Sequence, residues 1–188
     1  MLFPILVLRF NLTDDRDWAM NRLISILEED GYHMGGGLVS GKCVLDALTD
    51  GGRFDLAWRM ASQKEFPGWY SMVQLSHGGT LTESWRGGSS QNHHMFSEIG
   101  AWFYKALAGF IIDDEHPGFA RIRLMPHTPN DIKNFAAWKR TPRGILRTEW
   151  NEKEVAVTIP DGTEADFIYG CEKHALTAGQ YRFARICC

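Results

Sequence analysis

Residues 96–124 read FSEIGAWFYKALAGFIIDDEHPGFARIRL, and the spacing of apolar side chains changes within this stretch. Up to Gly109 the apolar residues recur every three or four positions, which is typical of an amphipathic helix. After the acidic, proline-bearing segment 113–117, apolar residues alternate with arginines, which is typical of a strand. The chain is therefore predicted to consist of a helical part over residues 1–112 and a β part over residues 117–188.

The helical part is predicted to be an array of helices joined by loops. Thr13 is a good N-cap for a helix that we expect to end near Glu29, because Gly31 can supply the left-handed turn that follows. The apolar stripes of three helices are Trp18, Leu23, Ile24 and Leu27, then Val44, Leu45 and Leu48, then Phe54, Ala57, Trp58 and Met60. Residues 65–91 are expected to be irregular, and the apolar segment Met1–Leu8 is expected to be the end of a buried helix.

The β part contains two further runs in which apolar and polar residues alternate. These are Gly144–Trp150 and Val155–Ile159, and the second run ends at the turn sequence Pro160-Asp161-Gly162. Short strands separated by turns predict an all-β module. No repeat of solenoid period interrupts this division.

Composition and charge exclude several classes of protein. The chain has 188 residues with 44% hydrophobic and 23% charged residues, which is ordinary for a globular protein, and its formal net charge of -3 argues against nucleic-acid binding. Met1–Leu8 is too short to span a bilayer, so no membrane association is expected. The four cysteines are too few and scattered for a disulfide scaffold, and we expect a reducing, cytoplasmic location.

Two motifs suggest cofactors, and both are weak. The segment Gly36-x4-Gly41-Lys42 resembles a phosphate-binding loop, but Cys43 stands where Ser or Thr should hold magnesium, and no strand precedes it. We expect a tight glycine bend between two helices instead. Cys171 and His174 lack a second pair of zinc ligands, and the adjacent His93 and His94 point in different directions on any regular element. The sequence therefore predicts no metal and no cofactor.

The segment Gly78–Gly88, GGTLTESWRGG, carries the strongest indication of a site. Glu83 lies between glycine pairs, which allow a loop to approach a ligand closely, and Trp85 can offer an apolar face to a sugar ring. His93 follows shortly after. A glutamate in a loop is usually only a solvated charge, whereas here it can act as a general base. Trp69 fits either a core position or a sugar platform, and the sequence leaves both open.

The order of short motifs along the chain resembles the C-terminal part of bacterial α-L-rhamnosidases of glycoside hydrolase family 78. The resemblance extends from about Phe10 to Phe183 and is specific because many elements occur in the right order. The matching segments are Gly31-Tyr32-His33, Leu45–Asp50, Asp55-Leu56-Ala57, Pro67-Gly68-Trp69, Thr80-x-x-Glu83-Ser84-Trp85, Asn92-His93, Gly100-x-Trp102-Phe103-Tyr104, Leu107-Ala108-Gly109 and Pro117-Gly118-Phe119.

This resemblance implies an α+β multidomain fold, with helices of a partial (α/α)6 barrel followed by an antiparallel β-sandwich domain. It also implies an inverting glycosidase that acts on a rhamnoside. Glu83 falls on the family's general base, His93 on a histidine that lines the sugar pocket, and Trp69 and Trp85 on aromatic positions around that pocket. Thr82 and Ser84 depart from the bulkier residue and the arginine common in the family, so the sugar preference could differ.

The general acid of that family lies in an earlier part of the barrel, which has no counterpart in this chain. Asp46, Asp50 and Glu98 are the nearby alternatives, and their positions on helices disfavour them. We therefore expect a fragment whose apolar face is covered by the missing half of the barrel or by a second copy. A non-catalytic carbohydrate-binding or interaction module that kept the aromatic surface is the alternative.

Overall fold

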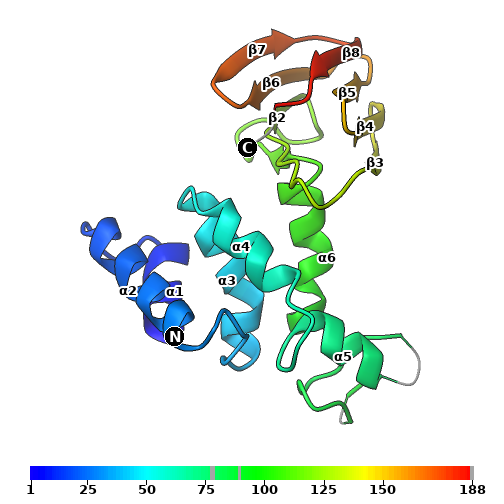
Figure 1. Ribbon diagram of the computed structural model, residues 1–188. Helices are drawn as coiled ribbons and strands as arrows, with labels where there is room; N and C mark the ends of the chain where they lie inside the picture. The colour runs from blue at the N-terminus through cyan, green and yellow to red at the C-terminus, as the bar shows by residue number, and fades with distance from the viewer. Residues whose placement is uncertain (77–78, 89, 187–188) are drawn as a thin grey trace. The chain divides into compact units, whose positions relative to one another are not determined.

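The computed structural model describes residues 1–76, 79–88 and 90–186, and these residues form two compact units. The first unit is Met1–Trp102 and the second is Phe103–Cys188. Figure 1 shows that the first consists of helices and loops and the second mainly of strands. The vicinal pair Cys187-Cys188 and the first glycine of the Glu83 segment, Gly78, lie outside the described residues.

The helical unit contains six helices among the described residues. They are α1 (Leu2–Arg9), α2 (Arg16–Glu29), α3 (Leu38–Asp50), α4 (Phe54–Ala61), α5 (Trp69–Leu75) and α6 (His94–Ala106). The boundary between the two units falls inside α6. Within these described ranges, none of the helices is both long and apolar enough to cross a membrane.

Helix α2 ends where the sequence predicts but begins later. The carboxylate of Asp15 accepts a hydrogen bond from the backbone N–H of Trp18 at 2.9 Å, so Asp15 is the N-cap. Thr13 was the expected cap, and its hydroxyl instead accepts from the N–H of Asp15. Gly31 follows the helix with a φ of 63°, as expected. Trp18 was expected in the apolar stripe, yet 51% of its surface is exposed.

The glycines before and inside α3 serve different purposes. Gly36 and Gly37 precede the helix, whereas Gly41 lies within it, so the expected bend does not extend to Gly41. A Cβ atom at Gly41 would lie 2.5 Å from Cε1 of Phe96 in α6. The absence of a side chain at Gly41 therefore lets the ring of Phe96 pack directly on the backbone of α3.

The β unit is a sandwich of two four-stranded sheets. The strands are β1 (Phe110–Ile112), β2 (Arg121–Leu124), β3 (Phe135–Thr141), β4 (Gly144–Trp150), β5 (Glu154–Ile159), β6 (Glu164–Tyr169), β7 (Glu172–Leu176) and β8 (Gly179–Ala184). The two sheets have the strand orders β1-β2-β6-β7 and β3-β4-β5-β8. All of these pairs are antiparallel except β2 with β6, which is parallel.

The inward-facing side chains of the two sheets form one apolar core. The rings of Phe167 in β6 and Phe183 in β8 stack across it with centroids 4.3 Å apart. Buried members come from both sheets, including Phe110, Ile122, Leu124, Leu146, Trp150, Val155, Val157, Ile159, Ala165, Phe167 and Tyr169. The predicted alternation over residues 144–150 and 155–159 is confirmed by the burial of every second residue.

The segment expected to link the two parts lies within the β unit. Residues 110–112 were expected in the helical part, but they form β1 and pair with β2. The segment between these strands turns on Asp113, whose carboxylate accepts from the N–H of Glu115 at 3.0 Å and contacts Nδ1 of His116 at 2.9 Å. The contact with His116 lowers the pKa of Asp113. A three-residue strand is too short for its alternation to be recognised in the sequence.

One arginine closes the end of the sandwich. The guanidinium group of Arg185 donates to the backbone carbonyls of Thr128, Pro129 and Asn151 at 2.9 to 3.1 Å and lies 4.9 Å from the centre of the Trp150 ring. Arginine offers five donors in a fixed plane, so one side chain can hold several loops. The segment after β8 is thereby tied to the loops that flank β3 and β4.

Candidate active site

The candidate site is the loop that joins α5 to α6. Thr82 forms an isolated antiparallel bridge with Gln91, and the N–H of Glu83 donates to the carbonyl of Ser90 at 3.1 Å. Thr82 is fully buried, and its hydroxyl donates to the carbonyl of Ser84 at 2.7 Å. The side chain of Glu83 is exposed. The loop therefore presents a carboxylate to solvent from a backbone held on both sides.

Trp85 anchors this loop to the rest of the helical unit. Its indole Nε1–H donates to the carbonyl of Gly36 at 3.0 Å, which fixes the loop against the segment before α3. Its ring lies 4.1 Å from that of Phe96 and meets that of Trp69 edge-on at 5.4 Å. Trp85 is only half-buried, so part of its indole remains available to a ligand.

Trp69 supports Trp85 from inside the unit. Only 4% of its surface is exposed, and its Nε1–H donates to the carbonyl of Phe96 at 2.9 Å. Of the two interpretations that the sequence left open, the core position fits this geometry better. Phe96 was expected only as part of the apolar face of its helix. In the structure its ring packs against Trp85, and its carbonyl accepts from Trp69. Helical spacing placed it on the buried face but could not reveal these partners.

His93 lies at the start of α6 beside the same loop. Its N–H donates to the carbonyl of Leu81 at 2.8 Å, and its carbonyl accepts from the hydroxyl of Ser97 at 2.9 Å. The ring stacks on that of His94 at 5.3 Å. Its Nδ1 atom is buried and has no hydrogen-bond partner among the residues described. His93 as a whole is half-buried, so another part of its ring remains accessible.

The acidic residues considered as alternatives lie elsewhere in the helical unit. Asp46 is buried on the face of α3 that meets α1, where Nη2 of Arg9 lies 3.7 Å from its carboxylate. Asp50 lies 3.8 Å from Nη1 of the same arginine. Glu98 lies on α6, half-buried. Asp46 and Asp50 therefore belong to an ion-pair cluster with α1, an element that does not contact the candidate loop in any of the interactions above.

The motifs that suggested cofactors have structural explanations. Burial raises the pKa of the Cys43 thiol, which makes it less reactive, and the carbonyl of Gly36 is used by Trp85. His174 lies 3.1 Å from the carboxylate of Glu172, and Cys171 is an exposed free thiol. Across residues 1–76, 79–88 and 90–186 there is no group of three or more His, Cys, Asp or Glu side chains that could hold a metal ion.

Two protein families match successive parts of the chain. Residues 3–107 match the bacterial α-L-rhamnosidase six-hairpin glycosidase domain. Residues 112–178 match the bacterial α-L-rhamnosidase C-terminal domain. The first match alone covers more than half of the chain.

Known proteins of the same kind align over most of this chain. An α-L-rhamnosidase of Alteromonas sp. (strain LOR) is 26% identical over 87% of the chain and 19% of its own length. One of Streptomyces avermitilis is 26% identical over 86% of the chain and 17% of its own length. The chain thus spans less than a fifth of the length of these relatives.

Solved structures show the same fold. The S. avermitilis α-L-rhamnosidase complexed with L-rhamnose superposes with a TM-score of 0.84 at 22% identity, over 97% of this chain and 21% of the other. The native α-L-rhamnosidase from Aspergillus terreus superposes with a TM-score of 0.87 at 23% identity. The superposition covers 98% of this chain and 24% of the other. The expected order, helices of a hairpin domain followed by a β domain, is thereby confirmed. From its helical unit through its sandwich, the chain belongs to the bacterial α-L-rhamnosidase family.

Proposed function

We propose that this chain supplies Glu83 as the general base of an inverting glycosidase that removes terminal α-L-rhamnosyl residues from glycosides. The observation that carries the proposal is the exposed carboxylate of Glu83 on a loop fixed by the Thr82–Gln91 bridge and by Trp85. A base must meet solvent, because the proton that it takes belongs to a water molecule. It must also be held in place, and the loop's hydrogen bonds provide this.

In the proposed reaction, Glu83 takes a proton from a water that attacks the anomeric carbon from the face opposite the leaving group. The proton moves to the carboxylate, the water oxygen bonds to the sugar, and the glycosidic bond breaks with inversion as its oxygen takes a proton from the general acid. The half-buried Trp85 stacks on the sugar ring, and the accessible part of the His93 ring binds one of its hydroxyls. Trp69 positions Trp85 by packing against its ring.

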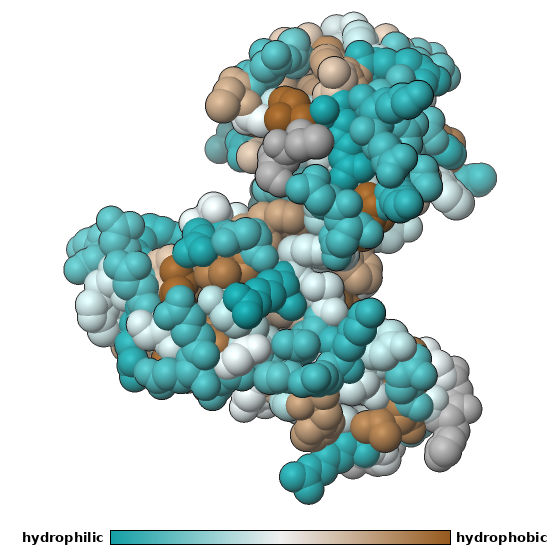
Figure 2. Space-filling model, in the orientation of Figure 1, coloured by the Kyte–Doolittle hydropathy of each residue, from teal (hydrophilic) through white to brown (hydrophobic). Residues whose placement is uncertain are grey.

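We propose that the general acid comes from outside the described residues of this chain. An inverting mechanism needs two carboxyl groups roughly 6.5–9.5 Å apart, and Asp46 and Asp50 are engaged by Arg9. We propose that a further segment of a longer polypeptide, or a second copy, brings the acid and covers an exposed apolar surface. Figure 2 shows apolar side chains, in brown, at the surface of the helical elements. Five large ones come from α1, the turn after it and the start of α2: Leu2, Phe3, Phe10, Leu12 and Trp18.

A chimera provides the test. Residues 3–178 replace the matching segment of the S. avermitilis α-L-rhamnosidase, and hydrolysis of 4-nitrophenyl α-L-rhamnoside is measured. The chimera should be active, and Glu83→Gln should lower its turnover by on the order of 10²–10⁴-fold, because glutamine keeps the size of the side chain but cannot take a proton. Azide, which needs no base, should restore bond cleavage with an inverted product.

The matched control is Glu65→Gln in the same chimera. Glu65 is an exposed glutamate outside the loop, with 84% of its side chain accessible, and its replacement should leave turnover unchanged. A Glu83→Gln chimera as active as its parent would remove Glu83 from the mechanism. Because Asp46 and Asp50 are paired with Arg9, they would not readily replace Glu83, and the alternative of a non-catalytic carbohydrate-binding module would then be favoured. Such a module would bind sugar without turnover.

We also propose a reducing, cytoplasmic setting for the chain. The thiols of Cys43 and Cys171 are both free, one buried and one exposed, which supports this setting. Thiol labelling of the native protein isolated under anaerobic conditions would show Cys171 reactive. Isolation of Cys171 in a disulfide would contradict the proposal.

A further inference from the structure

The outer face of the β3-β4-β5-β8 sheet carries a hollow that the proposed reaction does not use. Successive residues of a strand point to opposite faces, and the strand register aligns four outward residues in one row across the sheet: Ala136, Glu149, Ala156 and Arg182. The two alanines leave space between the longer side chains. The resulting hollow has a volume of about 470 Å³, which is within the range of small-molecule sites.

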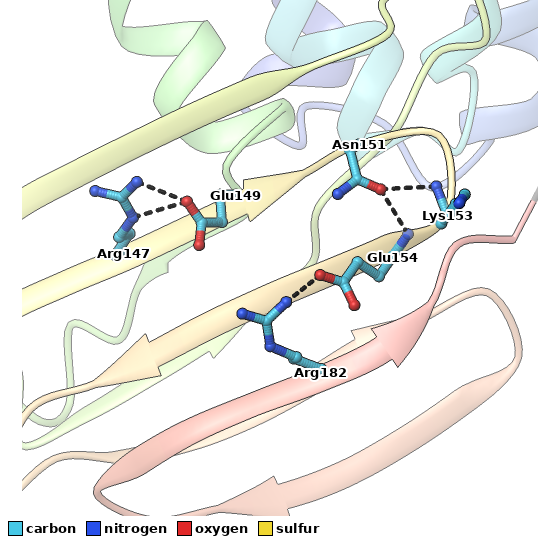
Figure 3. A network of polar contacts seen from close by, with 6 residues as sticks. All are labelled: Arg147, Glu149, Asn151, Lys153, Glu154 and Arg182. Carbon is cyan, nitrogen blue, oxygen red and sulfur yellow. Dashed lines mark hydrogen bonds and ion pairs between the residues drawn. The ribbon is translucent and has the colours of Figure 1, made fainter.

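The charged groups of this hollow are already balanced in pairs. Arg147 donates from Nε and Nη2 to Oε2 of Glu149 at 3.1 and 2.6 Å, and Arg182 donates to Oε1 of Glu154. Figure 3 shows these two pairs on neighbouring strands, with Asn151 at the turn between them. The second oxygen of each carboxylate can still accept a hydrogen bond. A ligand with a net charge would meet no unbalanced opposite charge, whereas a neutral ligand rich in hydroxyls can both donate and accept here.

An exposed tryptophan lies next to the hollow on the same face. Trp138 is two residues after Ala136 on β3, and 57% of its surface is exposed. Its cross-strand partner is Arg147, whose guanidinium lies 5.9 Å from the ring and also binds Glu149. A single chain of contacts therefore joins the indole to the wall of the hollow. Ile145, two residues before Arg147 on the same face, adds a second exposed apolar side chain, with 42% of its surface exposed.

We infer that this face is a second, non-catalytic carbohydrate-binding site for a neutral sugar unit. The sugar's apolar ring face lies on Trp138, and its hydroxyls enter the hollow to bond with Glu149, Glu154 and Arg182. A peptide added to a sheet edge would use backbone groups of β3 or β8, whereas this hollow lies on the face of the sheet, near the turn that joins β4 to β5. An apolar ligand would leave the second oxygen of each carboxylate without a hydrogen-bond donor. The site lies wholly within the β unit and does not depend on Glu83.

The test is a titration of the ¹⁵N-labelled 188-residue chain, followed by backbone and indole signals. The probes are methyl α-L-rhamnoside, methyl β-D-glucoside and D-galacturonate. At least one neutral glycoside should cause saturable shifts of the Trp138 indole signal and of the amides of Ala136, Glu149 and Ala156. Tighter, salt-sensitive binding of the uronate would overturn the neutral-ligand assignment.

Two pairs of variants locate the binding. Trp138→Ala should weaken it by about tenfold through loss of the stacked indole, while Trp18→Ala, which removes a similarly exposed indole from the helical unit, should not. Ala156→Leu should abolish binding by filling the hollow, and Thr158→Leu, two residues on and on the same face of β5, should preserve it. Binding that is unchanged in Ala156→Leu would overturn the inference.

The result is separable from the proposed catalysis, because it is read from signals of the β unit and not from turnover. Shifts confined to Trp85 and His93 would mean that the only sugar site is the loop described above, and the second site would be refuted. Shifts at Trp138 in a protein whose Glu83→Gln chimera retains full activity would refute the catalytic role and leave this site standing.

Discussion

The two units differ in how completely they bury their own apolar side chains. In the β unit, the inner faces of both sheets meet in one core that buries large side chains from both sheets. In the helical unit, large apolar side chains from α1 and the start of α2 remain accessible together, and Phe3 and Leu12 are 65% and 67% exposed. A sandwich closes a core with its own two layers, whereas an array of helices exposes apolar surface until further helices cover it. The unit with the candidate base is therefore the one for which we propose a cover.

The largest expected effect concerns that cover. If the acid comes from outside the described residues, as we propose, the chain alone should hydrolyse 4-nitrophenyl α-L-rhamnoside at least on the order of 10²–10⁴-fold more slowly than the chimera. Initial rates at equal concentration check this. Comparable turnover by the purified chain would show that an acid exists within it, and Asp46 and Glu98 would be replaced by their amides first.

A matched pair of deletions should separate the two units in stability. Phe167→Ala removes a fully buried ring from the sandwich core and should cost about 3–5 kcal/mol of unfolding free energy. Phe3→Ala removes the same atoms from an exposed position and should cost less than about 0.5 kcal/mol. Urea denaturation followed by circular dichroism measures both. Equal costs would mean that the surface around Phe3 is already covered, for instance by a second copy.

The contact of α3 with α6 should tolerate less change than the exposed surface of the same unit. Gly41→Ala places a methyl group 2.5 Å from the ring of Phe96 and should cost about 1–3 kcal/mol, of which up to about 1 kcal/mol is offset by better helix propensity. Because Phe96 packs on Trp85, indole fluorescence should change as well. Gly52→Ala is not a suitable control, since the φ of 76° at Gly52 adds strain of its own. Ser25→Ala, on the exposed face of α2, is the better control for Gly41→Ala.

The smallest effect is a pH dependence confined to the β unit. Burial lowers the pKa of His127 from its usual value of 6.5, so the folded unit prefers the neutral ring. The unfolded chain then binds more protons near pH 6, and stability should fall as the pH drops below about 6.5. His127→Gln should flatten this part of the pH profile, as measured by thermal unfolding at several pH values. An unchanged slope would exclude His127 as its source.

Local rules predicted the regular elements well and the irregular ones poorly. Gly31 marks the end of α2 because a left-handed residue is needed there, and alternation marks β4 and β5 because each has one buried face. Helix α5 was missed within the segment 65–91, since only seven residues are helical and they follow Gly68 without a capping side chain. At Gly41 the decisive partner, Phe96, is far away in the sequence, and no local pattern reports such a contact.

The same limit applies to the candidate site. The glycines and tryptophans around Glu83 indicated a ligand-binding loop, but the partners that hold it come from outside that segment. Trp85 binds a carbonyl before α3, and the bridge that flanks Glu83 pairs Thr82 with Gln91. The sequence left Trp69 undecided because stacking and burial favour the same residue type. Only the packing of the helices around Trp69 favours the core position over the sugar platform.

The parallel pairing of β2 with β6 constrains the order in which the protein can fold during synthesis. β2 ends at Leu124 and its partner begins at Glu164, so three strands of the other sheet must leave the ribosome before the first sheet gains its third strand. Until then the hairpin of β1 and β2 has an unpaired edge, and the inward residue Ile122 lacks its cover. The second edge of β5 stays unpaired longer still, until β8 has been synthesised. The helical unit is synthesised first, and the β unit gains its last sheet pairing only when β8 has emerged.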